Sequence, residues 1–456
     1  MSAFSLILSV AAVLANETTA LQSLVDRASE SGGGVVRIPP GGHMVASLRL
    51  KSGVTLFLED GARLVGSTNY ADYVTAPGDN RGAVVWSDSA HDVAIVGNGV
   101  IDGRGGLAPH VCGTPGRWRG VALYRTKGVR IEGIEIRDAH TWACYLCNCE
   151  DVVVRGLRIE NHVNYNNDGL DIEASNMLVE DCYIDSEDDG IVFKARTPES
   201  RVENVVVRNC RVFSNSSAIK VGTESRGRFS NITVSNCVVG VSRPISVRDD
   251  YAGVPGVTNR MTGLAAIDVS VVDGGSLEGF RVSDVSIGGG FLVPFFLRHG
   301  RRGVSPRESF FRDVMIEHVR MTGCAASRMS SAVTGVAAFN WTDLSSWWNA
   351  LTPWNWKVMK SLRPSNVVFR DVSVLLPADC EEDSVHWIVP ERADVYPSAF
   401  MFGPSLLPSS AFYVRHADGV VLDGVEVRRV GGPRRRSAIV AEDAEVSVVD
   451  VKEVDL

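Results

Sequence analysis

Apolar residues recur along the chain with the spacing apolar-x-x-apolar-x-apolar. The middle positions of the first five copies are Ile134, Leu157, Cys182, Cys210 and Cys237. These positions are 23, 25, 28 and 27 residues apart, and the next step, to Val285, is 48 residues and fits two such units. A period of about 20–30 residues with two short β-rich runs per unit indicates a solenoid. Because the units lack helical periodicity, we predict an all-β parallel β-helix.

Rungs of a β-helix stack so that equivalent residues form columns. We therefore expect Cys182, Cys210 and Cys237 to occupy one equivalent position. Thr18–Ser31 reads as an amphipathic helix that caps the open end of the first rung. The three glycines at 32–34 end this helix, and Val35–Ile38 starts the first strand.

The N-terminal residues contain the apolar run Ser5–Ala15, followed at once by polar residues. Its length is typical of a signal-peptide core, although no Lys or Arg precedes it. We predict a signal peptide at 1–15, a β-helix domain at 16–456 and a secreted or periplasmic protein. A buried N-terminal strand or helix is the alternative.

A Trp-rich insertion interrupts the repeat at about residues 325–362. It contains five of the nine Trp residues, namely Trp341, Trp347, Trp348, Trp354 and Trp356. Such an insertion could be a sugar-stacking lid. A hydrophobic loop packed on the β-helix, or a protein contact, is the slightly favoured alternative.

Composition narrows the possible functions. The net charge of −8 argues against a generic nucleic-acid binder. No stretch reaches the roughly 18 uncharged apolar residues of a membrane-spanning helix. Cys144, Cys147 and Cys149 lie close together, but no second Cys/His cluster completes a zinc site, so we interpret them as buried core residues.

Carboxylates gather at two successive turns of the repeat. Asp188 and Asp189 lie six and seven residues after Cys182, and Asp168 occupies a comparable turn one rung earlier. Three carboxylates on rungs about 4.8 Å apart repel one another, so we expect at least one raised pKa. Glycoside hydrolysis needs such a protonated acid beside an ionised base. Ordinary turn residues or a calcium site are the alternatives.

At these residues the sequence resembles glycoside hydrolase family 28, the polygalacturonase and rhamnogalacturonan hydrolase group. Asn166-Asn167-Asp168-Gly169-Leu170-Asp171 matches the family's Asn-x-Asp motif, and Asp188-Asp189-Gly190 through Lys194 matches its Asp-Asp motif. The likeness extends from the Gly-Gly-Gly opening to Val427. It implies a right-handed β-helix and an inverting mechanism. Asp188 would be the general acid, while Asp168 and Asp189 would position and deprotonate water.

The chain departs from the family at two later motifs. Ser217 occupies the position of the His in Gly-His-Gly, while Ser246 and Arg248 stand for the Arg and Lys of Arg-x-Lys. Lys220 is an additional cation. We expect Lys194, Lys220 and Arg248 to form a positive strip on the cleft and to bind substrate together with Asn166. Pairing between a Lys and a neighbouring Asp is an equal alternative.

These observations predict a hydrolase that cleaves a pectin-like or other acidic polysaccharide. A non-catalytic glycan-binding β-helix and a calcium-dependent polysaccharide lyase are the alternatives. We expect a polysaccharide or oligosaccharide substrate, no cofactor, no metal and a monomer.

Overall fold

The computed structural model describes residues 3–108, 116–243, 263–302, 308–337, 361–379, 385, 388–402, 406–431 and 436–456, with side chains described from Glu17 onward. The chain folds into two compact units. The first consists mainly of Met1–Val192 and Val205–Arg211, and the second of Phe193–Asn204 and most of the chain after Val212.

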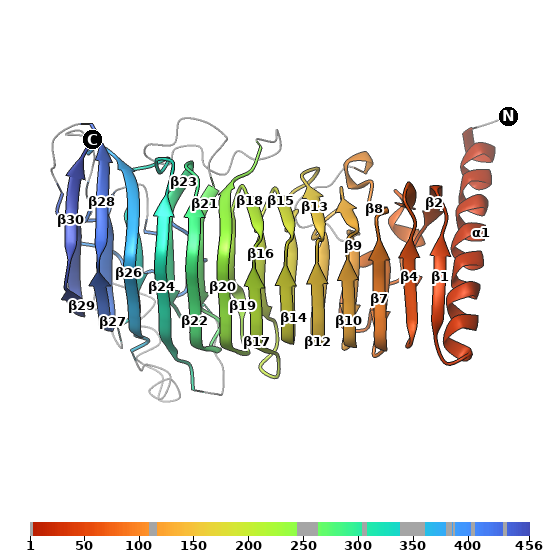
Figure 1. The fold of residues 1–456 in the computed structure, drawn as a ribbon, viewed down its shortest axis with the longest axis horizontal. Coiled ribbons are helices and arrows are strands. Elements are labelled where there is room, and N and C mark those ends of the chain that lie inside the picture. Colours follow the sequence, from red (N-terminus) through yellow and green to blue (C-terminus); the bar gives the residue numbers. More distant parts are fainter. Residues whose placement is uncertain are drawn as a thin grey trace. The chain divides into compact units, whose positions relative to one another are not determined.

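Three parallel sheets make up the first unit (Figure 1). The first sheet contains β1 (Gly34–Ile38), β4 (Val54–Leu58), β7 (His91–Gly97), β10 (Lys127–Glu132) and the second halves of β12 (Cys144–Arg155) and β14 (Leu170–Glu180). The second contains β2 (Gly41–Val45), β5 (Ala62–Gly66), β8 (Val100–Asp102), β11 (Glu135–Arg137), β13 (Arg158–Asn161) and β15 (Tyr183–Ser186). The third contains β3 (Leu48–Arg49), β6 (Gly82–Asp88), β9 (Trp118–Tyr124) and the first halves of β12 and β14.

The register of these strands confirms the predicted parallel β-helix. Ile131 pairs with Val154, which pairs in turn with Val179, and all three are fully buried. Because apolar side chains at one position of the repeat stack on the next rung, each rung buries the apolar surface of its neighbour. The repeat in the sequence is therefore the hydrophobic core of the fold.

Two of the three cysteines predicted to share a column lie on neighbouring rungs of the first unit. The backbone N–H of Arg211, next to Cys210, donates to the Cys182 carbonyl at 2.9 Å, and Tyr183 N–H donates in the same way to Leu157. Leu157, Cys182 and Cys210 thus occupy equivalent positions and are all buried. Cys237, in the second unit, is also buried.

A single helix, α1 (Ala3–Glu30), lies beside β1 and β2 (Figure 1). It caps the edge of the first rung, because Gln22 accepts from Arg49 N–H at 2.9 Å and donates to the Arg49 carbonyl at 3.0 Å. The helix ends at two glycines with positive φ, Gly32 (88°) and Gly33 (125°), as predicted. Its start differs from the prediction, because the helix begins at Ala3 rather than Thr18 and includes the run Ser5–Ala15. Whether that run is a signal peptide stays a prediction.

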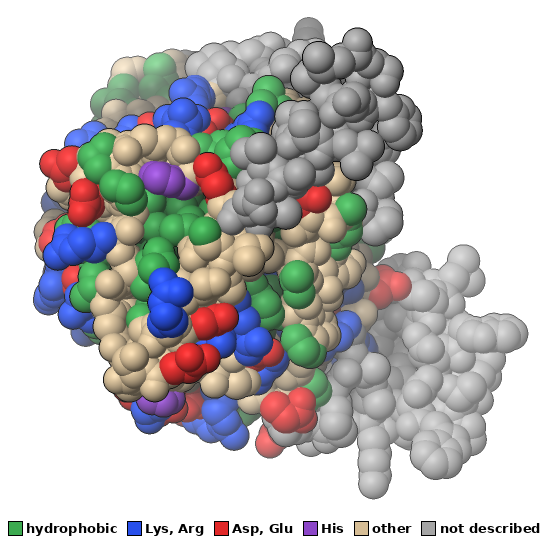
Figure 2. Space-filling model, turned by 90° about the vertical axis from the view of Figure 1, so that its right-hand side faces the viewer, with side chains coloured by type: hydrophobic (Ala, Val, Ile, Leu, Met, Phe, Trp, Pro, Cys, Tyr) green, Lys and Arg blue, Asp and Glu red, His purple; other side chains and the backbone are tan. Residues whose placement is uncertain are grey.

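No helix within the described part of the chain combines the length and the apolar character needed to cross a bilayer. Seen from the end that carries α1, the surface intersperses Lys and Arg with Asp and Glu rather than gathering one sign of charge (Figure 2).

The second unit repeats the same three-sheet plan. Its first and second sheets contain β20 (Arg228–Val241), β22 (Ser276–Ile287), β24 (Phe311–Met321), β26 (Pro364–Pro377), β28 (Val425–Val430) and β30 (Val451–Asp455). Its third sheet contains β19 (Ser217–Ser225), β21 (Gly263–Val271), β23 (Phe291–His299), β25 (Ser331–Thr334) and the first halves of β27 (Phe412–Asp423) and β29 (Ile439–Val448). The chain passes between the units within β16 (Ile191–Ala195), β17 (Arg201–Arg208) and β18 (Arg211–Ser214).

The interpretation of the 48-residue step as two repeat units is wrong. Cys237 pairs directly with Val285, so β20 and β22 are neighbours and the step is one rung. The extra residues lie between β20 and β21, largely in 244–262, outside the described residues. The five Trp residues of the predicted insertion are likewise outside the described residues, and the ladder resumes with Phe311 pairing with Pro364.

Alternate residues of the third sheet point away from the core, and this outer face differs between the units. In the first unit Ala122 pairs with Tyr145, which pairs with Asp171. The Arg119 guanidinium lies 4.7 Å from the Tyr145 ring centroid, and Tyr145 Oη donates to Glu173 at 2.9 Å. This face is thus built from buried charges and rings.

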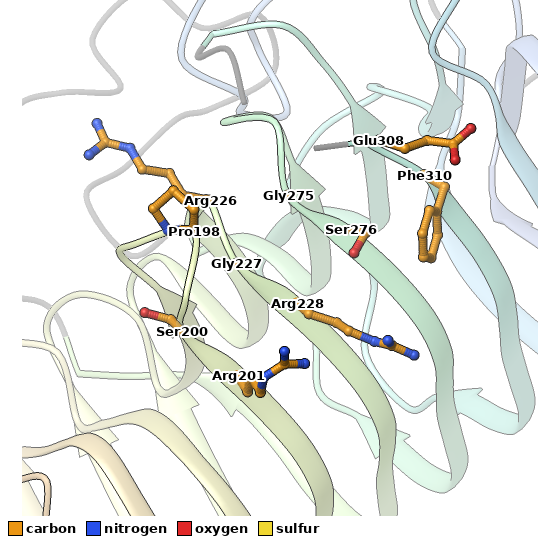
Figure 3. Close-up of a pocket in the computed structure, with 10 residues that line it drawn as sticks. All are labelled: Pro198, Ser200, Arg201, Arg226, Gly227, Arg228, Gly275, Ser276, Glu308 and Phe310. Atoms are coloured by element: carbon orange, nitrogen blue, oxygen red, sulfur yellow. The ribbon is translucent and has the colours of Figure 1, made fainter. Parts of the chain in front are cut away.

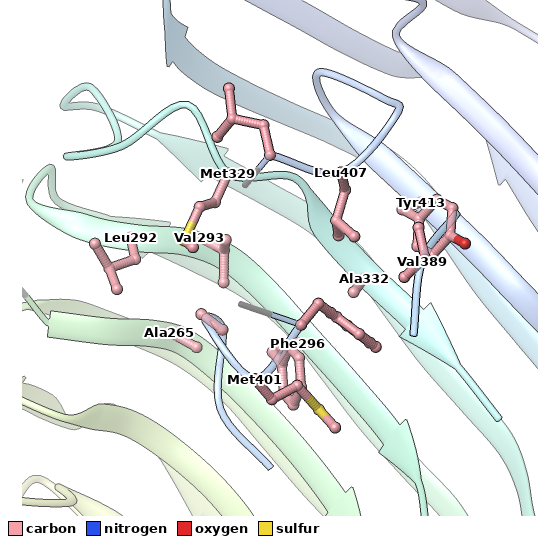
Figure 4. Close-up of a cluster of buried hydrophobic side chains, with 13 residues drawn as sticks. Ala265, Leu292, Val293, Phe296, Met329, Ala332, Val389, Met401, Leu407 and Tyr413 are labelled. Carbon is pink, nitrogen blue, oxygen red and sulfur yellow. The ribbon is translucent and has the colours of Figure 1, made fainter. Parts of the chain in front are cut away.

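In the second unit the same face becomes apolar along the sheet. Phe296 pairs with Ala332, which pairs with Tyr413, and all three are buried. Residues from the segments 388–402 and 406–407 cover them, including Val389, Met401, Phe402 and Leu407. Figure 4 shows Met401 beside Phe296 and Leu407 above Ala332, so the chain packs its own C-terminal region on this face.

Candidate active site

Asp168 lies in the turn between β13 and β14, and amide side chains hold this turn. Asn161 Nδ2 donates to the carbonyls of Thr141 and Asp168 at 2.8 and 2.9 Å. Asn167 Nδ2 donates to the carbonyls of Ala139 and Thr141 at 3.0 and 2.9 Å. Four bonds from two buried Asn residues fix the backbone that carries Asp168, as short polar side chains commonly do in turns.

Asp188 and Asp189 lie in the equivalent turn between β15 and β16. Ser186 Oγ lies 3.1 Å from the carbonyl oxygens of both Asp188 and Asp189. The Ser hydroxyl thereby supports the sharp turn in which adjacent carboxylates can point in different directions. An acid and a base on neighbouring residues require such a turn.

The two turns are hydrogen-bonded to each other. Gly169 N–H donates to the Asp189 carbonyl at 2.9 Å, and Asp188 N–H donates to the Asn167 carbonyl at 3.3 Å. Asp168 and the Asp188–Asp189 pair therefore lie on neighbouring rungs. Because rungs are about 4.8 Å apart, residues 20 positions apart in the sequence form one compact site.

Asn166 connects the turns through its side chain. It adopts a left-handed backbone conformation, with φ of 53°, and its Nδ2 donates to Asp188 Oδ2 at 3.1 Å. Its Oδ1 accepts from the Arg117 guanidinium at 3.1 Å. Arg117, which the sequence did not suggest, also donates to the His140 carbonyl at 2.9 Å. Asn166, predicted to bind substrate, thus positions Asp188 in this structure.

The three predicted catalytic carboxylates are buried, with exposed fractions of 3% for Asp168, 6% for Asp188 and 5% for Asp189. These residues therefore have little contact with bulk water. Electrostatic interactions inside such a site are stronger than in water, which favours proton transfer between closely held groups.

Two of the predicted cations lie in the second unit. Lys194 and Lys220 are 4% and 2% exposed, so they are as buried as the three carboxylates, and their role in substrate binding stays a prediction. Lys194 Nζ lies 3.4 Å from Glu224 Oε2, and Lys220 Nζ lies 3.4 Å from the hydroxyl of Tyr396. Arg248, like Ser246, lies outside the described residues.

Glu224 is a carboxylate beside these cations. Burial alone would raise the pKa of Glu224, but the charge of Lys194, a backbone hydrogen bond and the charges of Lys220 and Arg302 lower it to about 2. Arg302 is itself paired with Asp273, at 2.7 Å. Lys194 and Lys220 thus lie among groups of both charges.

Ser217, at the position of the family's His, points to another acid. Its Oγ donates to Asp268 Oδ2 at 3.2 Å, and Ser270 Oγ donates to Asp268 Oδ1 at 2.5 Å. Two hydroxyl donors thus hold Asp268 on β21.

The cysteine cluster is confirmed as buried core. Cys144, Cys147 and Cys149 are buried, and burial raises the pKa of the Cys149 thiol to about 12. Within the described residues, no group of three or more His, Cys, Asp or Glu side chains is arranged to hold a metal ion.

A pocket of about 220 Å³ in the second unit is lined by none of the predicted site residues (Figure 3). Its lining includes Arg201, Arg226, Arg228, Glu308 and Phe310. It contains one carboxylate and no acid pair, so it lacks the groups for acid and base catalysis. We therefore place the candidate active site at the carboxylate turns rather than in this pocket.

Comparisons with known proteins agree with this fold. A family model described as right handed beta helix region matches residues 79–239. A probable polygalacturonase from Vitis vinifera is 26% identical over 280 residues, which are 51% of this chain and 56% of the relative. The chain spans about half the length of the curated relatives that it matches.

Solved structures show the same architecture. The Yersinia enterocolitica family 28 exopolygalacturonase aligns with a TM-score of 0.61 and 16% identity over 94% of this chain and 74% of that one. The Streptococcus pneumoniae surface adhesin PfbA aligns with a TM-score of 0.59 and 12% identity over 94% and 88%. The chain is a parallel β-helix protein that is distantly similar to curated polygalacturonases.

Proposed function

We propose that the protein is a glycoside hydrolase that cleaves a pectin-like or other acidic polysaccharide with inversion at the anomeric carbon. The observation that carries the proposal is the pair of hydrogen-bonded turns that bring Asp168 beside Asp188 and Asp189. Polygalacturonase relatives support the choice of substrate class. The apolar run at Ser5–Ala15 supports action outside the cytoplasm.

Asp188 is the general acid of this mechanism. Asn166 Nδ2 donates to Asp188 Oδ2, and because the carbonyl oxygen of a carboxylic acid is a better acceptor than its hydroxyl oxygen, this contact favours the proton on Oδ1. The proton that passes to the glycosidic oxygen is then held at Oδ1. Arg117, through its bond to Asn166, positions the acid without touching the reacting atoms.

Asp168 and Asp189 position the attacking water and remove its proton. Their turns lie on adjacent rungs and share the bond from Gly169 N–H to the Asp189 carbonyl. Acid and base of an inverting enzyme stand roughly 6.5–9.5 Å apart, which leaves room for that water. The anomeric configuration of the first product, α or β, is read by NMR and tests this arrangement.

A glycan-binding protein without catalysis is the second candidate, because Ser217 replaces the family's His and a surface adhesin shares the fold. A panel of pectic and other acidic glycans distinguishes the candidates. The hydrolase releases reducing ends in the presence of chelator, a lyase releases products that absorb in the ultraviolet and stops in chelator, and a binder does neither. Reducing ends formed with inversion support the proposal, and either other result overturns it.

A further inference from the structure

Arg81 lies one residue before β6 in the first unit, with its guanidinium over an aromatic ring. Its Cζ is 4.6 Å from the centroid of Trp142, a side chain that is 6% exposed. An Arg on the face of a Trp gains a cation–π contact while its N–H edge stays available for other bonds. The Arg81 side chain itself is only partly buried.

Trp142 is fixed next to the turn that carries Asp168. The following residue, Ala143, donates its N–H to the Asp168 carbonyl at 3.0 Å. The preceding residue, Thr141, donates its hydroxyl to the Asn166 carbonyl at 3.3 Å. The ring that supports Arg81 is therefore placed on the rung beside Asp168, about 4.8 Å along the stack.

Two arginines share Trp142, and they differ in how their donors are used. Arg119 lies 4.9 Å from the same ring, is fully buried and is paired with Asp79 at 3.2 Å. It also donates to the Tyr124 hydroxyl at 2.9 Å. Among the described residues, the Arg81 guanidinium has no ion pair or hydrogen bond, and only its backbone N–H is bonded, to Asp79.

Charged side chains of both signs lie near Arg81. Burial and the nearby charge of Arg119 lower the pKa of Arg81, whereas the charges of Asp79, Asp168 and Asp171 raise it. Arg81 is thus within electrostatic range of Asp168. A guanidinium with free N–H donors in partly dry surroundings is suited to bind a carboxylate through two parallel hydrogen bonds.

We propose that Arg81, supported by Trp142, binds the carboxylate of an acidic sugar unit next to Asp168. This inference rests on the proposed function and specifies which residue recognises the acidic substrate. In this inference, the cation that binds the sugar acid is Arg81 of the first unit. Lys194 and Lys220 of the second unit are instead buried near Glu224. A methyl ester or a neutral sugar cannot form the bidentate ion pair, so Arg81 would discriminate in favour of the free acid.

The test is binding of trigalacturonic acid and its methyl ester, measured by calorimetry in the Asp188→Asn background so that the probe is not consumed. Arg81→Gln is expected to weaken binding of the acid by about 10- to 100-fold, the range for a lost charge-assisted hydrogen bond, and binding of the ester by less than about 3-fold. Arg81→Lys keeps the charge without the fork and is expected to restore part of the affinity.

Arg49→Gln is the matched control. Arg49 also lies over a Trp, with its Cζ 5.1 Å from the Trp86 centroid, but it is on β3, four strands of the third sheet away from β14. It is expected to leave both affinities unchanged. Equal losses for acid and ester in Arg81→Gln, or an equal loss in Arg49→Gln, overturn the inference. So does a shift in the pH profile of kcat in Arg81→Gln with KM unchanged, since that shows that Arg81 acts through Asp168.

The inference and the proposed function can fail separately. If the acid trimer binds in an Arg81-dependent way and the native chain releases no reducing ends, the binding site stands and the hydrolase does not. If the native chain cleaves the trimer with a KM that Arg81→Gln leaves unchanged, the hydrolase stands and the Arg81 site does not. Melting temperatures of both Arg81 variants show whether a loss reflects unfolding.

Discussion

The outer face of the third sheet changes character between the first unit and the later rungs of the second, from β23 onward. In the first unit it presents Tyr145, Asp171 and Glu173 with Arg119, and in the second it presents Phe296, Ala332 and Tyr413 beneath residues of the chain's own C-terminal region. The backbone geometry of the ladder is the same in both. Side chains at alternate positions therefore decide whether a rung presents charged groups or a docking surface for the chain itself.

The largest effect should come from removing the proposed acid in the first unit. Asp188→Asn keeps the shape and the bond to Asn166 but removes the proton donor, so turnover of a natural glycan should fall by about 10² to 10⁴. An activated aryl glycoside needs little protonation and should be largely spared. Asp185→Asn, on β15 and paired with His162, is the control and should keep turnover within about twofold. Full activity of Asp188→Asn on natural glycan would contradict the assignment.

The second unit should respond to substitution through stability instead. Phe296 is 1% exposed and lies under Met401 and Phe402, so Phe296→Ala leaves a cavity and should cost about 3–5 kcal/mol in the free energy of unfolding. Phe296→Leu retains most of the volume and should cost under about 1.5 kcal/mol. Denaturant unfolding measures both. A loss below about 1 kcal/mol for Phe296→Ala would show that segment 388–402 packs loosely on this face.

Protonation of one histidine should make the second unit sensitive to acid. Burial, followed by the charge of Arg298, lowers the pKa of His299 to about 3 from its usual 6.5. The imidazole of His299 binds a proton more readily in the unfolded chain than in the folded one. The free energy of unfolding should therefore fall as the pH drops from about 6.5 to about 3, by up to about 1.4 kcal/mol per pH unit. Melting curves of native chain and His299→Gln at several pH values test this. Parallel pH dependences in the two would exclude His299 as the cause.

The fold could be predicted from the sequence because its repeat is also its core. The steps between Ile134, Leu157 and Cys182 are nearly constant, and each step returns the chain to the same column. The 48-residue step misled the count because length added between β20 and β21 leaves the register of Cys237 with Val285 intact. The spacing between two equivalent positions gives the number of residues between them and not the number of turns that the chain makes.

The site was predicted only as far as its motifs extend. The turns of Asp168 and Asp188 carry recognisable short patterns, and their neighbourhood follows from rung stacking. Arg117 and Arg81 lie in no such pattern, because their partners are far away in the sequence. Arg117 contacts Asn166, 49 positions later, and Arg81 contacts Trp142, 61 positions later. The burial of Lys194 and Lys220 depends on Glu224 and Tyr396, and the sequence does not indicate that Tyr396 returns to a strand 176 residues earlier.

The smallest expected effect concerns Tyr396, where the charged and apolar parts of the second unit's outer face meet. Its hydroxyl lies 3.4 Å from Lys220 Nζ and 3.5 Å from Thr223 Oγ1, and its ring centroid lies 5.8 Å from Lys220 Nζ and 5.4 Å from Arg302 Cζ. Long hydrogen bonds donated to a side chain that is 51% exposed contribute little, so Tyr396→Phe should cost under about 0.5 kcal/mol in the free energy of unfolding. Tyr396→Ala also removes the ring from two cations and should cost about 0.5–1 kcal/mol more. A Phe variant as unstable as the Ala variant would show that the hydroxyl, rather than the ring, holds the loop at this cationic network.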